Sequence, residues 1–408
     1  MALFLLIIIY LAFISLGLPD SLLGSAWPVM QKDFGPPLET AGLLFMAMAG
    51  CTIISSLVSG RVLKRFGTGR VTLVSCLMTA VSLLGFYFAP SLVWLIVCTI
   101  PLGLGAGAVD SGLNDYVAVH YKAHHMSWLH CFWGIGATAG PMIMSYFISG
   151  QDSWRNGYLT ISGIQFALVA ILFITLPLWN RGKENGNGQK DSSGEVNLEY
   201  PQQVKPVQIQ GVKLSMVSFL FYCGVEAAVG LWGSSFLVNV KELSAGTAAQ
   251  WVSFYYAGIT IGRFFTGFIT FKTTNRTLIR MGQITALAGA ILTILPLPSV
   301  FSLAGFIIVG LGLAPIFPCM LHETPARFGK QHSQTIMGYQ MAVAYTGSTF
   351  MPPLLGFIAS HSTMKIFPYW IFIFVGLMLL TSEKLNTLLK KKRLMETKDS
   401  CASDIVQM

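Results

Sequence analysis

The sequence has little charge. Only 11% of its 408 residues are Asp, Glu, Lys or Arg, whereas 53% are hydrophobic, and the mean hydropathy is +0.63. A soluble domain carries roughly 25% charged residues, so most of this chain is expected to lie where charge is costly. The composition argues against a soluble protein and favours one embedded in a lipid bilayer.

Signatures of catalysis and metal binding are also lacking. The 7 cysteines are scattered and form no CxxC pair, which argues against both a disulfide framework and a zinc site. No nucleotide-binding loop of the GxxxxGK(S/T) type is present, and no HExxH or GxSxG stretch occurs in an accessible context. We therefore expect no enzyme activity, no cofactor and no direct coupling to ATP hydrolysis.

What the sequence does contain is a series of long apolar runs. A bilayer core of about 30 Å requires about 20 apolar residues per helix. The first run lacks the basic start and cleavage site of a signal peptide, so we interpret it as a helix. We expect an all-α membrane protein with twelve transmembrane helices, at 3–24, 40–60, 70–89, 92–113, 126–149, 157–179, 213–238, 248–271, 278–297, 299–321, 334–360 and 364–381.

The basic residues are distributed unevenly over the connections between these runs. Of the 26 Lys and Arg residues, 21 lie in alternate connections and the C-terminal tail, and only 4 lie in the other set of connections. Cytoplasmic loops carry the excess of basic residues, so both termini are expected in the cytoplasm, with the chain in the plasma membrane (the inner membrane of a cell that has two). The net charge of +9 thus reflects topology, and we expect no nucleic-acid partner.

A single long polar segment divides the chain into two halves. It is rich in Gly, Asn, Gln, Ser and Lys and is unsuited to packing. GLGAG from Gly103 and GLGLAP from Gly310 echo each other, which favours two pseudo-symmetric six-helix bundles, although Gly and Pro are also common in membrane helices. We expect an N-terminal bundle at 1–180, a cytoplasmic linker at 181–212, a C-terminal bundle at 213–382 and a cytoplasmic tail at 383–408.

The connection between the second and third runs reads GRVLKRFGTGR. It resembles the GxxxDRxGRR signature of the major facilitator superfamily, with Lys64 in place of the usual acidic residue. The resemblance implies two six-helix bundles that rock about a central site. It also implies a conformational role for this loop, in which the matching residues are Gly60, Arg65, Gly67 and Arg70.

Further motifs resemble the fucose permease-like branch of that superfamily, which contains sugar symporters. GLPDSLLGSAWP places Asp20 at an acidic position, and GLGAGAVDSGLNDYV places Asp110 and Asn114 at the acidic and amide positions of the branch's fourth helix. FYCGVEAAVGLW, which contains Glu226, is similar to the seventh-helix motif. The resemblance implies symport of a monosaccharide or a similar small polar solute by a protein that we expect to be a monomer.

Three acids lie inside the expected spans, where each costs roughly 2.5–3.5 kcal/mol. We interpret Asp20, Asp110 and Glu226 as proton-coupling residues, because a carboxyl in a poorly solvated cavity can load and release a proton. Structural interpretations stay open: an interfacial carboxylate for Asp20, a packing bond for Asp110, and an ion pair with Arg263 for Glu226.

Sugar hydroxyls and C–H faces favour amides, imidazoles and aromatic rings. The mid-helix candidates for binding a sugar-like solute are Asn114, His130, Trp133, Trp232, Tyr256 and Gln340, although any one aromatic residue can equally be ordinary packing. Three alternatives to a proton-coupled sugar symporter stay open. These are an efflux antiporter, suggested by GATAGP at 136–141, a sodium-coupled sugar carrier, and a membrane protein without transport activity.

Overall fold

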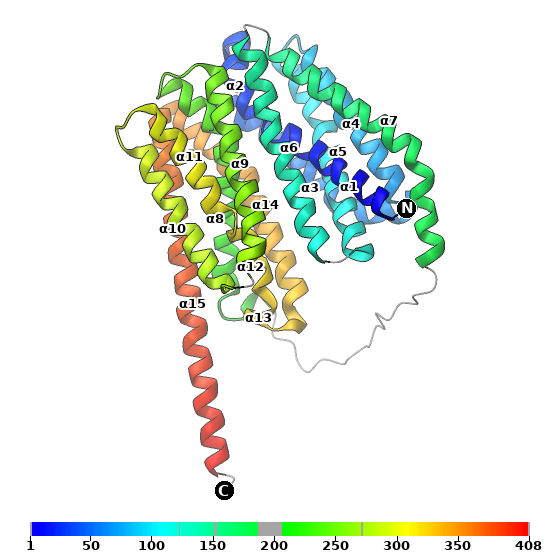
Figure 1. The fold of residues 1–408 in the computed structure, drawn as a ribbon. Helices are drawn as coiled ribbons and strands as arrows, with labels where there is room; N and C mark the ends of the chain where they lie inside the picture. Colours follow the sequence, from blue (N-terminus) through cyan, green and yellow to red (C-terminus); the bar gives the residue numbers. More distant parts are fainter. Residues whose placement is uncertain (1, 122, 151–152, 187–205, 271, 407–408) are drawn as a thin grey trace.

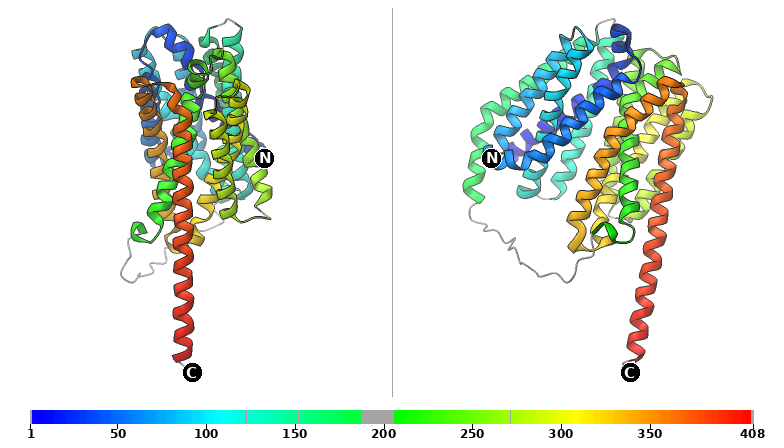
Figure 2. Two further views of the ribbon diagram at one scale, coloured as in Figure 1. Left: turned by 90° about the vertical axis from the view of Figure 1, so that its left-hand side faces the viewer. Right: turned by 180° about the vertical axis from the view of Figure 1, so that it is seen from behind.

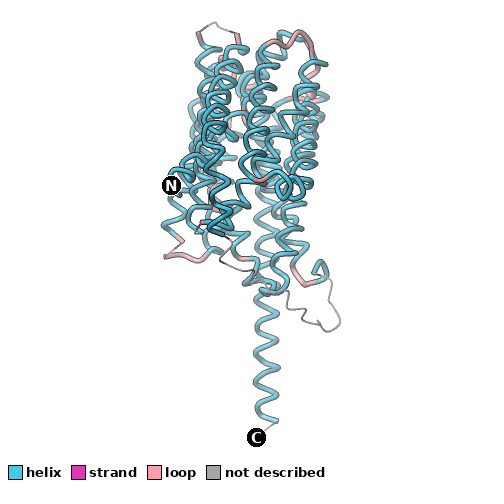
Figure 3. Tube along the Cα trace, turned by 90° about the vertical axis from the view of Figure 1, so that its right-hand side faces the viewer, coloured by secondary structure: helices cyan, strands magenta, loops and turns pink. Residues whose placement is uncertain are grey.

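The computed structural model describes residues 2–121, 123–150, 153–186, 206–270 and 272–406, and these residues form no strand (Figure 3). The first half contains α1 (Ala2–Asp20), α2 (Leu22–Phe34), α3 (Thr40–Phe66), α4 (Thr68–Tyr87), α5 (Leu92–His120), α6 (Ala123–Ser149) and α7 (Trp154–Gly186). The second half contains α8 (Val212–Asn239), α9 (Ala245–Ile269), α10 (Asn275–Ile294), α11 (Ser299–Leu313), α12 (Ile316–His322), α13 (Thr324–Phe328), α14 (Lys330–His361) and α15 (Phe367–Val406).

The helices form two bundles that lie side by side, α1 to α7 in one and α8 to α15 in the other (Figure 1). Within the described residues, 11 spans are long and apolar enough to cross a membrane, and α1 with α2 counts as one of them. The expected span at 248–271 corresponds to α9, a 25-residue helix that carries Gln250 and Arg263 and is not one of these 11. Large apolar side chains such as Leu57 and Ile174 are exposed on the outside, as a lipid environment requires.

Several helices differ from their expected bounds. The first span reaches Phe34 rather than residue 24, with a break between α1 and α2 at Ser21. The tenth breaks between α11 and α12 at Pro315, which has no backbone N–H to continue the ladder. The last helix runs on as one rod through Val406 and projects beyond the bundle (Figure 2). Of the expected linker, residues 187–205 lie outside the described residues.

Glycines set the same helix spacing in both halves. A Cβ atom on Gly103 of α5 would lie 2.2 Å from the Met48 carbonyl oxygen of α3, so the backbones touch only because this residue lacks a side chain. Gly310 of α11 has the same relation to the Tyr255 carbonyl of α9, again at 2.2 Å. Both members of the second pair lie 207 residues after those of the first. The repeated contact confirms the pseudo-symmetry expected from the two glycine motifs.

A second repeated contact relates the first span to α8. Gly136 meets the carbonyl of Ile14, and Gly347 meets that of Leu220, which lies 206 residues after Ile14. The same spacing makes Asp20 the counterpart of Glu226.

The same 206-residue spacing also pairs Gly24 of α2 with Gly230 of α8. These two glycines touch each other, since a Cβ on Gly24 would lie 2.1 Å from the Gly230 carbonyl oxygen. Contact between equivalent residues occurs on a two-fold axis, so the pseudo-symmetry axis passes through this point.

The two halves meet at one end of the molecule, opposite the C-terminus (Figure 1). We call this the closed end. Besides the Gly24–Gly230 contact, Gly42 of α3 packs on the backbone of Pro353 in α14. The Ser253 hydroxyl of α9 donates to the Thr138 carbonyl of α6 at 2.6 Å. The closed end is the end away from the loops that carry most of the basic residues.

Candidate functional site

A proline places Asp20 at a break in the first span. Pro19 has no N–H, so the carbonyl of Ser15 loses its helical donor. The side chain of Gln165 in α7 replaces that donor, with Nε2 at 2.7 Å from the Ser15 carbonyl oxygen. The freed carbonyl is thereby satisfied, and α1 ends at Asp20 in the middle of the span. Broken helices are a common device for building solute and ion sites in transporters.

Asp20 is held by the first half of the molecule. The indole Nε1 of Trp133 in α6 donates to Asp20 Oδ2 at 2.7 Å. The pair is positioned by close packing of α1 on α6, since a Cβ on Gly17 would lie 2.1 Å from the Trp133 carbonyl oxygen. A neutral indole supplies a hydrogen bond but no compensating charge.

The second half contributes an ion pair. Nη2 of Arg263 in α9 lies 3.1 Å from Glu226 Oε1 of α8, and their side chains are only 14% and 18% exposed. The same nitrogen donates to the Tyr222 hydroxyl at 3.3 Å. Within the described residues, this is the one ion pair between two helices that lies at mid-span. This ion pair with Arg263 is the structural interpretation that the sequence left open for Glu226.

Contacts between aromatic rings and the guanidinium join the two halves. The guanidinium carbon of Arg263 lies 5.4 Å from the centre of the Trp133 ring, within the range of a cation–π interaction. Tyr256 of α9 meets the same indole edge-on, with ring centres 6.4 Å apart. We call Asp20, Trp133, Glu226, Tyr256 and Arg263 the central cluster. Asp20 and Glu226, counterparts across the pseudo-symmetry axis, are close enough to interact electrostatically.

Asp110 and Asn114 form a second polar pair on α5. Asn114 Nδ2 donates to Asp110 Oδ1 at 2.9 Å and also to the backbone carbonyl of Asp110. Asp110 is close enough to interact electrostatically with Asp20 and with Tyr345 of α14 in the opposite half. Asp110 thus interacts electrostatically with Asp20 of the central cluster, while its hydrogen bonds are made within its own helix.

The remaining candidates for solute binding lie in different surroundings. His130 is exposed on α6, edge-on to Phe13, and is close enough to interact electrostatically with Arg263. Trp232 is fully buried and donates to the Pro352 carbonyl at 2.7 Å. Gln340 is fully buried and donates to Ser215 Oγ at 2.7 Å. The structure thus gathers Trp133 and Tyr256 in the central cluster, sets His130 near it, and places Trp232 and Gln340 inside the second bundle.

The loop that resembles the superfamily signature is a tight turn between α3 and α4. Gly67 has φ of 82°, a backbone conformation that favours glycine, and it ends one helix and begins the next. Gly60, Arg65 and Arg70 are exposed. A conformational role for this loop stays a prediction.

Two residues of the site were missed as functional candidates. In the sequence, Arg263 stands out only as a structural cation, the one Lys or Arg that lies deep in an expected span, away from the connections and tail that hold the other 25. Tyr222 belongs to the FYCGVE stretch but was not singled out. Their positions in the spans could have indicated this role. A cation and an acid at similar depth in neighbouring helices are expected to pair, and Tyr222 lies one helical turn before Glu226.

The family comparison agrees with the fold. A profile of the Major Facilitator Superfamily matches residues 9–345. The glucose/mannose transporter GlcP of Bacillus subtilis is 22% identical over 377 residues, which cover 90% of this chain and 92% of that protein. The Saccharomyces cerevisiae protein named bypass of stop codon protein 6 is 23% identical over 393 residues, covering 90% of this chain and 79% of its own.

Solved structures show the same fold. The xylose transporter XylE from E. coli, in an inward open conformation, superposes with a TM-score of 0.75 at 13% identity, covering 95% of this chain and 96% of that one. A bacterial homologue of the human lysosomal transporter Spinster gives a TM-score of 0.71 at 13% identity, covering 95% and 97%. From the matched profile and the two six-helix bundles, the chain belongs to the Major Facilitator Superfamily, and the proteins named here by their function, GlcP, XylE and the Spinster homologue, are transporters and not enzymes.

Proposed function

We propose that this protein is a proton-coupled symporter that carries a monosaccharide or a similar small polar solute across the plasma membrane by alternating access. The observation that carries the proposal is the central cluster. Its aromatic rings, Trp133 and Tyr256, come from opposite halves and meet at the interface. A solute with apolar C–H faces bound against both rings contacts both halves, which links its binding to their relative motion.

A hexose is the solute class that we favour. The relative GlcP is named a glucose/mannose transporter, and XylE a xylose transporter. The cluster combines flat aromatic faces with charged groups that accept or donate hydrogen bonds, the two kinds of contact that a sugar offers. A single chain supplies both halves of the cluster, so we propose that the monomer is the transporting unit.

The balance of charge in the central cluster and at the neighbouring Asp110 supports proton coupling. Arg263 is paired with Glu226, whereas Asp20 and Asp110 have neutral partners, Trp133 and Asn114. An ionised carboxylate without a compensating cation is costly away from water. We assign the coupling proton to the Asp20 and Asp110 carboxylates. The role proposed for Glu226 is to hold Arg263 beside the solute.

The orientation follows from charge. We place the end with the basic loops, together with both termini, in the cytoplasm, which makes the closed end extracytoplasmic. The structure then represents the inward-facing stage of the cycle. The bundles at 1–180 and 213–382 are the two bodies that rock, and the segment between them is a cytoplasmic connection.

Counterflow in liposomes tests the transport function. Purified protein is reconstituted, the liposomes are loaded with unlabelled glucose, mannose, xylose or fucose, and the uptake of labelled sugar is followed. We expect transient accumulation with at least one hexose and none in protein-free liposomes. A chain that supports no counterflow with any of these sugars would contradict the proposed solute class.

A further inference from the structure

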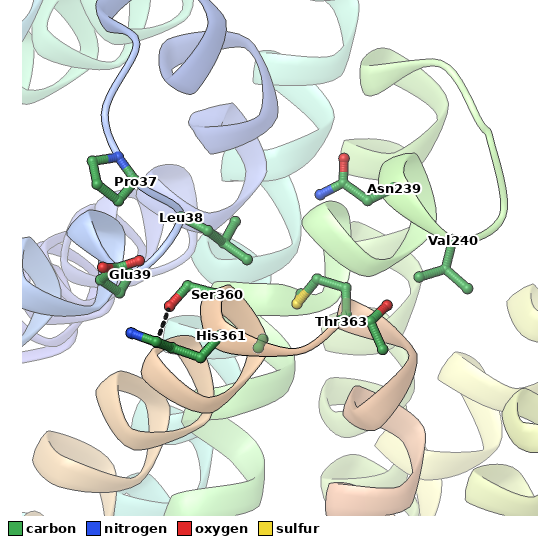
Figure 4. A pocket seen from close by; sticks show the side chains of 10 residues that line it. Pro37, Leu38, Glu39, Asn239, Val240, Ser360, His361 and Thr363 are labelled. Atoms are coloured by element: carbon green, nitrogen blue, oxygen red, sulfur yellow. Dashed lines mark hydrogen bonds between the residues drawn. The ribbon is translucent and has the colours of Figure 1, made fainter.

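A pocket of about 400 Å³ opens at the closed end, between the two halves (Figure 4). One wall is the connection between α2 and α3, with Leu38 and Glu39. The facing wall is the end of α8, with Asn239 and Val240, and the floor is the turn from α14 into the following segment, with His361. We call it the outer pocket. It lies well away from the central cluster, which occupies the middle of the spans.

On the pseudo-symmetric side of the closed end, the counterparts of the pocket residues make direct contacts instead. The counterpart of Asn239 is Asp33, which lies 206 residues earlier. Asp33 accepts a hydrogen bond from Trp154 Nε1 at 2.6 Å and pairs with Arg155 at 3.5 Å. Asn239, by contrast, is exposed on the pocket wall.

The counterpart of the junction between α3 and α14 is the junction between α9 and α6, and it is tightly packed. Ser145 Oγ donates to the Gly246 carbonyl at 2.7 Å. A Cβ on Gly246 would lie 2.0 Å from Ser149 Oγ. One side of the closed end is thus filled by direct contacts, whereas the equivalent side holds the outer pocket.

Glu39 lines the pocket, and one of its two carboxylate oxygens has no hydrogen-bond partner among the described residues. Its Oε2 is buried and makes no hydrogen bond within the described part of the chain. Glu39 is also the residue that precedes α3, yet its side chain makes no capping bond to that helix. A buried carboxylate oxygen without a donor is costly, so an arrangement in which the Glu39 carboxylate accepts a hydrogen bond from a ligand in the pocket is favourable.

The other polar groups of the pocket add both donors and acceptors. His361 Nδ1 lies 2.9 Å from the Phe357 carbonyl oxygen and 3.0 Å from Ser360 Oγ, whose own proton is donated to the same carbonyl. Since the carbonyl only accepts, both contacts of Nδ1 are satisfied when Nδ1 carries the proton. In the neutral ring Nε2 is then an acceptor. Ser360 and Asn239 contribute a hydroxyl and an amide, beside the apolar faces of Leu38 and Val240. These donors, acceptors and apolar faces together suit a small ligand that carries several hydroxyl groups.

We propose that the outer pocket is a second binding site for the transported class of solute, a small polyhydroxylated molecule such as a hexose, at which the solute docks before the halves separate at this end. The site rests on the proposed function for the identity of its ligand. Because its walls come from both halves, its shape changes when they move. The solute is held first by Glu39 and His361 and then passes between α3 and α14 toward the central cluster.

Protection from chemical labelling tests this site. Val240→Cys is made in the full-length chain, reconstituted in liposomes, and reacted with a membrane-impermeant maleimide, with the parent chain as the background. We expect glucose or mannose, whichever supports counterflow, to slow the reaction. Glu39→Gln should raise the half-protecting concentration at least about tenfold, the loss expected for one hydrogen bond to a charged group. Glu242→Gln, an exposed acid outside the pocket, is the matched control and should change nothing.

A substitution in the central cluster separates local binding from a change of conformation. In the Trp133→Leu background, protection of Val240→Cys should persist, because the outer pocket does not include that residue. The proposal is overturned if sugar no longer protects Val240→Cys in the Trp133→Leu background. It is also overturned if sugar protects Val240→Cys equally well when Glu39→Gln or His361→Asn is present. A sugar that supports counterflow but does not protect Val240→Cys also overturns the outer-pocket proposal, and it leaves the proposed transport function intact. Protection without counterflow supports the pocket and contradicts the transport function.

Discussion

Arg263 is the residue that ties the two halves of the site together. It pairs with Glu226 inside the second half and lies over Trp133 of the first. Its depth in the span was evident from the sequence, but its partners were not, because a long side chain can equally extend to the membrane surface. The sequence indicates that three acids lie inside the spans, while their division into one ion-paired carboxylate and two with neutral partners required the structure.

The Arg263–Glu226 pair should contribute strongly to stability. Glu226→Gln or Arg263→Gln leaves one uncompensated charge away from water, and we expect each to cost about 3 kcal/mol or more. The double variant should recover most of this loss, because neither charge remains. The measurement is the thermal unfolding midpoint in detergent.

The control for that measurement is the ion pair between Arg280 and Glu383, of which Arg280 is more than half exposed. An exposed pair contributes about 0–1 kcal/mol, so Glu383→Gln should leave the midpoint nearly unchanged. Equal effects of Glu383→Gln and Glu226→Gln would contradict the view that burial makes the inner pair important.

Asp110→Asn should abolish accumulation driven by a proton gradient while sparing part of the counterflow. Asparagine keeps the size and the hydrogen-bonding capacity of the side chain but cannot cycle between charged and neutral forms, and exchange needs shape rather than titration. Asp115→Asn, an exposed acid on the same helix, is the control and should retain full accumulation. If Asp110→Asn still concentrates solute and only Glu226→Gln fails, the coupling proton belongs to the second half.

At the scale of helices, the spans were predictable and the breaks were not. A run of apolar residues indicates a helix because the bilayer leaves no other way to satisfy the backbone. The break after Asp20 depends on a contact between distant parts of the chain, since Gln165 satisfies the carbonyl that Pro19 frees. The glycine motifs indicated close packing, but the contact of Gly24 with Gly230 emerged only from the arrangement of both halves.

Gly24→Val should open the closed end. A side chain at Gly24 meets the Gly230 carbonyl, so the two halves can no longer approach at the pseudo-symmetry axis. Ser253→Cys reports this opening, because Ser253 is fully buried against the carbonyl of Thr138. We expect an impermeant maleimide to react with Ser253→Cys faster when Gly24→Val is present.

Gly163 provides the matched glycine, since a Cβ there meets nothing within 4 Å. Gly163→Val should leave the labelling of Ser253→Cys as it is in the parent. Unchanged labelling with Gly24→Val as well would show that this glycine contact does not hold the closed end together.

At the scale of the whole molecule, the alternation of basic loops and the internal repeat predicted two six-helix bundles, and the fold confirms them. The closed end could not be predicted, because the inward- and outward-facing arrangements use the same spans and differ only in which end of the interface is packed. The unequal packing on the two sides of the pseudo-symmetry axis likewise depends on contacts such as Ser145 with Gly246.

The distribution of basic residues over the loops predicts the orientation of the chain in the membrane. A reporter fused after residue 195, within the polar segment between the bundles, should behave as cytoplasmic, because most of the basic residues lie on that side. A second fusion after Glu242, on the opposite side, should behave as extracytoplasmic. A reversed pair of signals would place the closed end in the cytoplasm and invert the direction of access.

Proton-driven accumulation of sugar is the most direct test of the proposed coupling. Liposomes that contain the protein are given labelled glucose or mannose under an inward proton gradient, an inward sodium gradient, or neither. We predict concentration of the sugar above its external level with the proton gradient alone, and loss of that concentration with Asp20→Asn. Accumulation that follows the sodium gradient, or a sugar that only equilibrates under both gradients, would contradict proton symport.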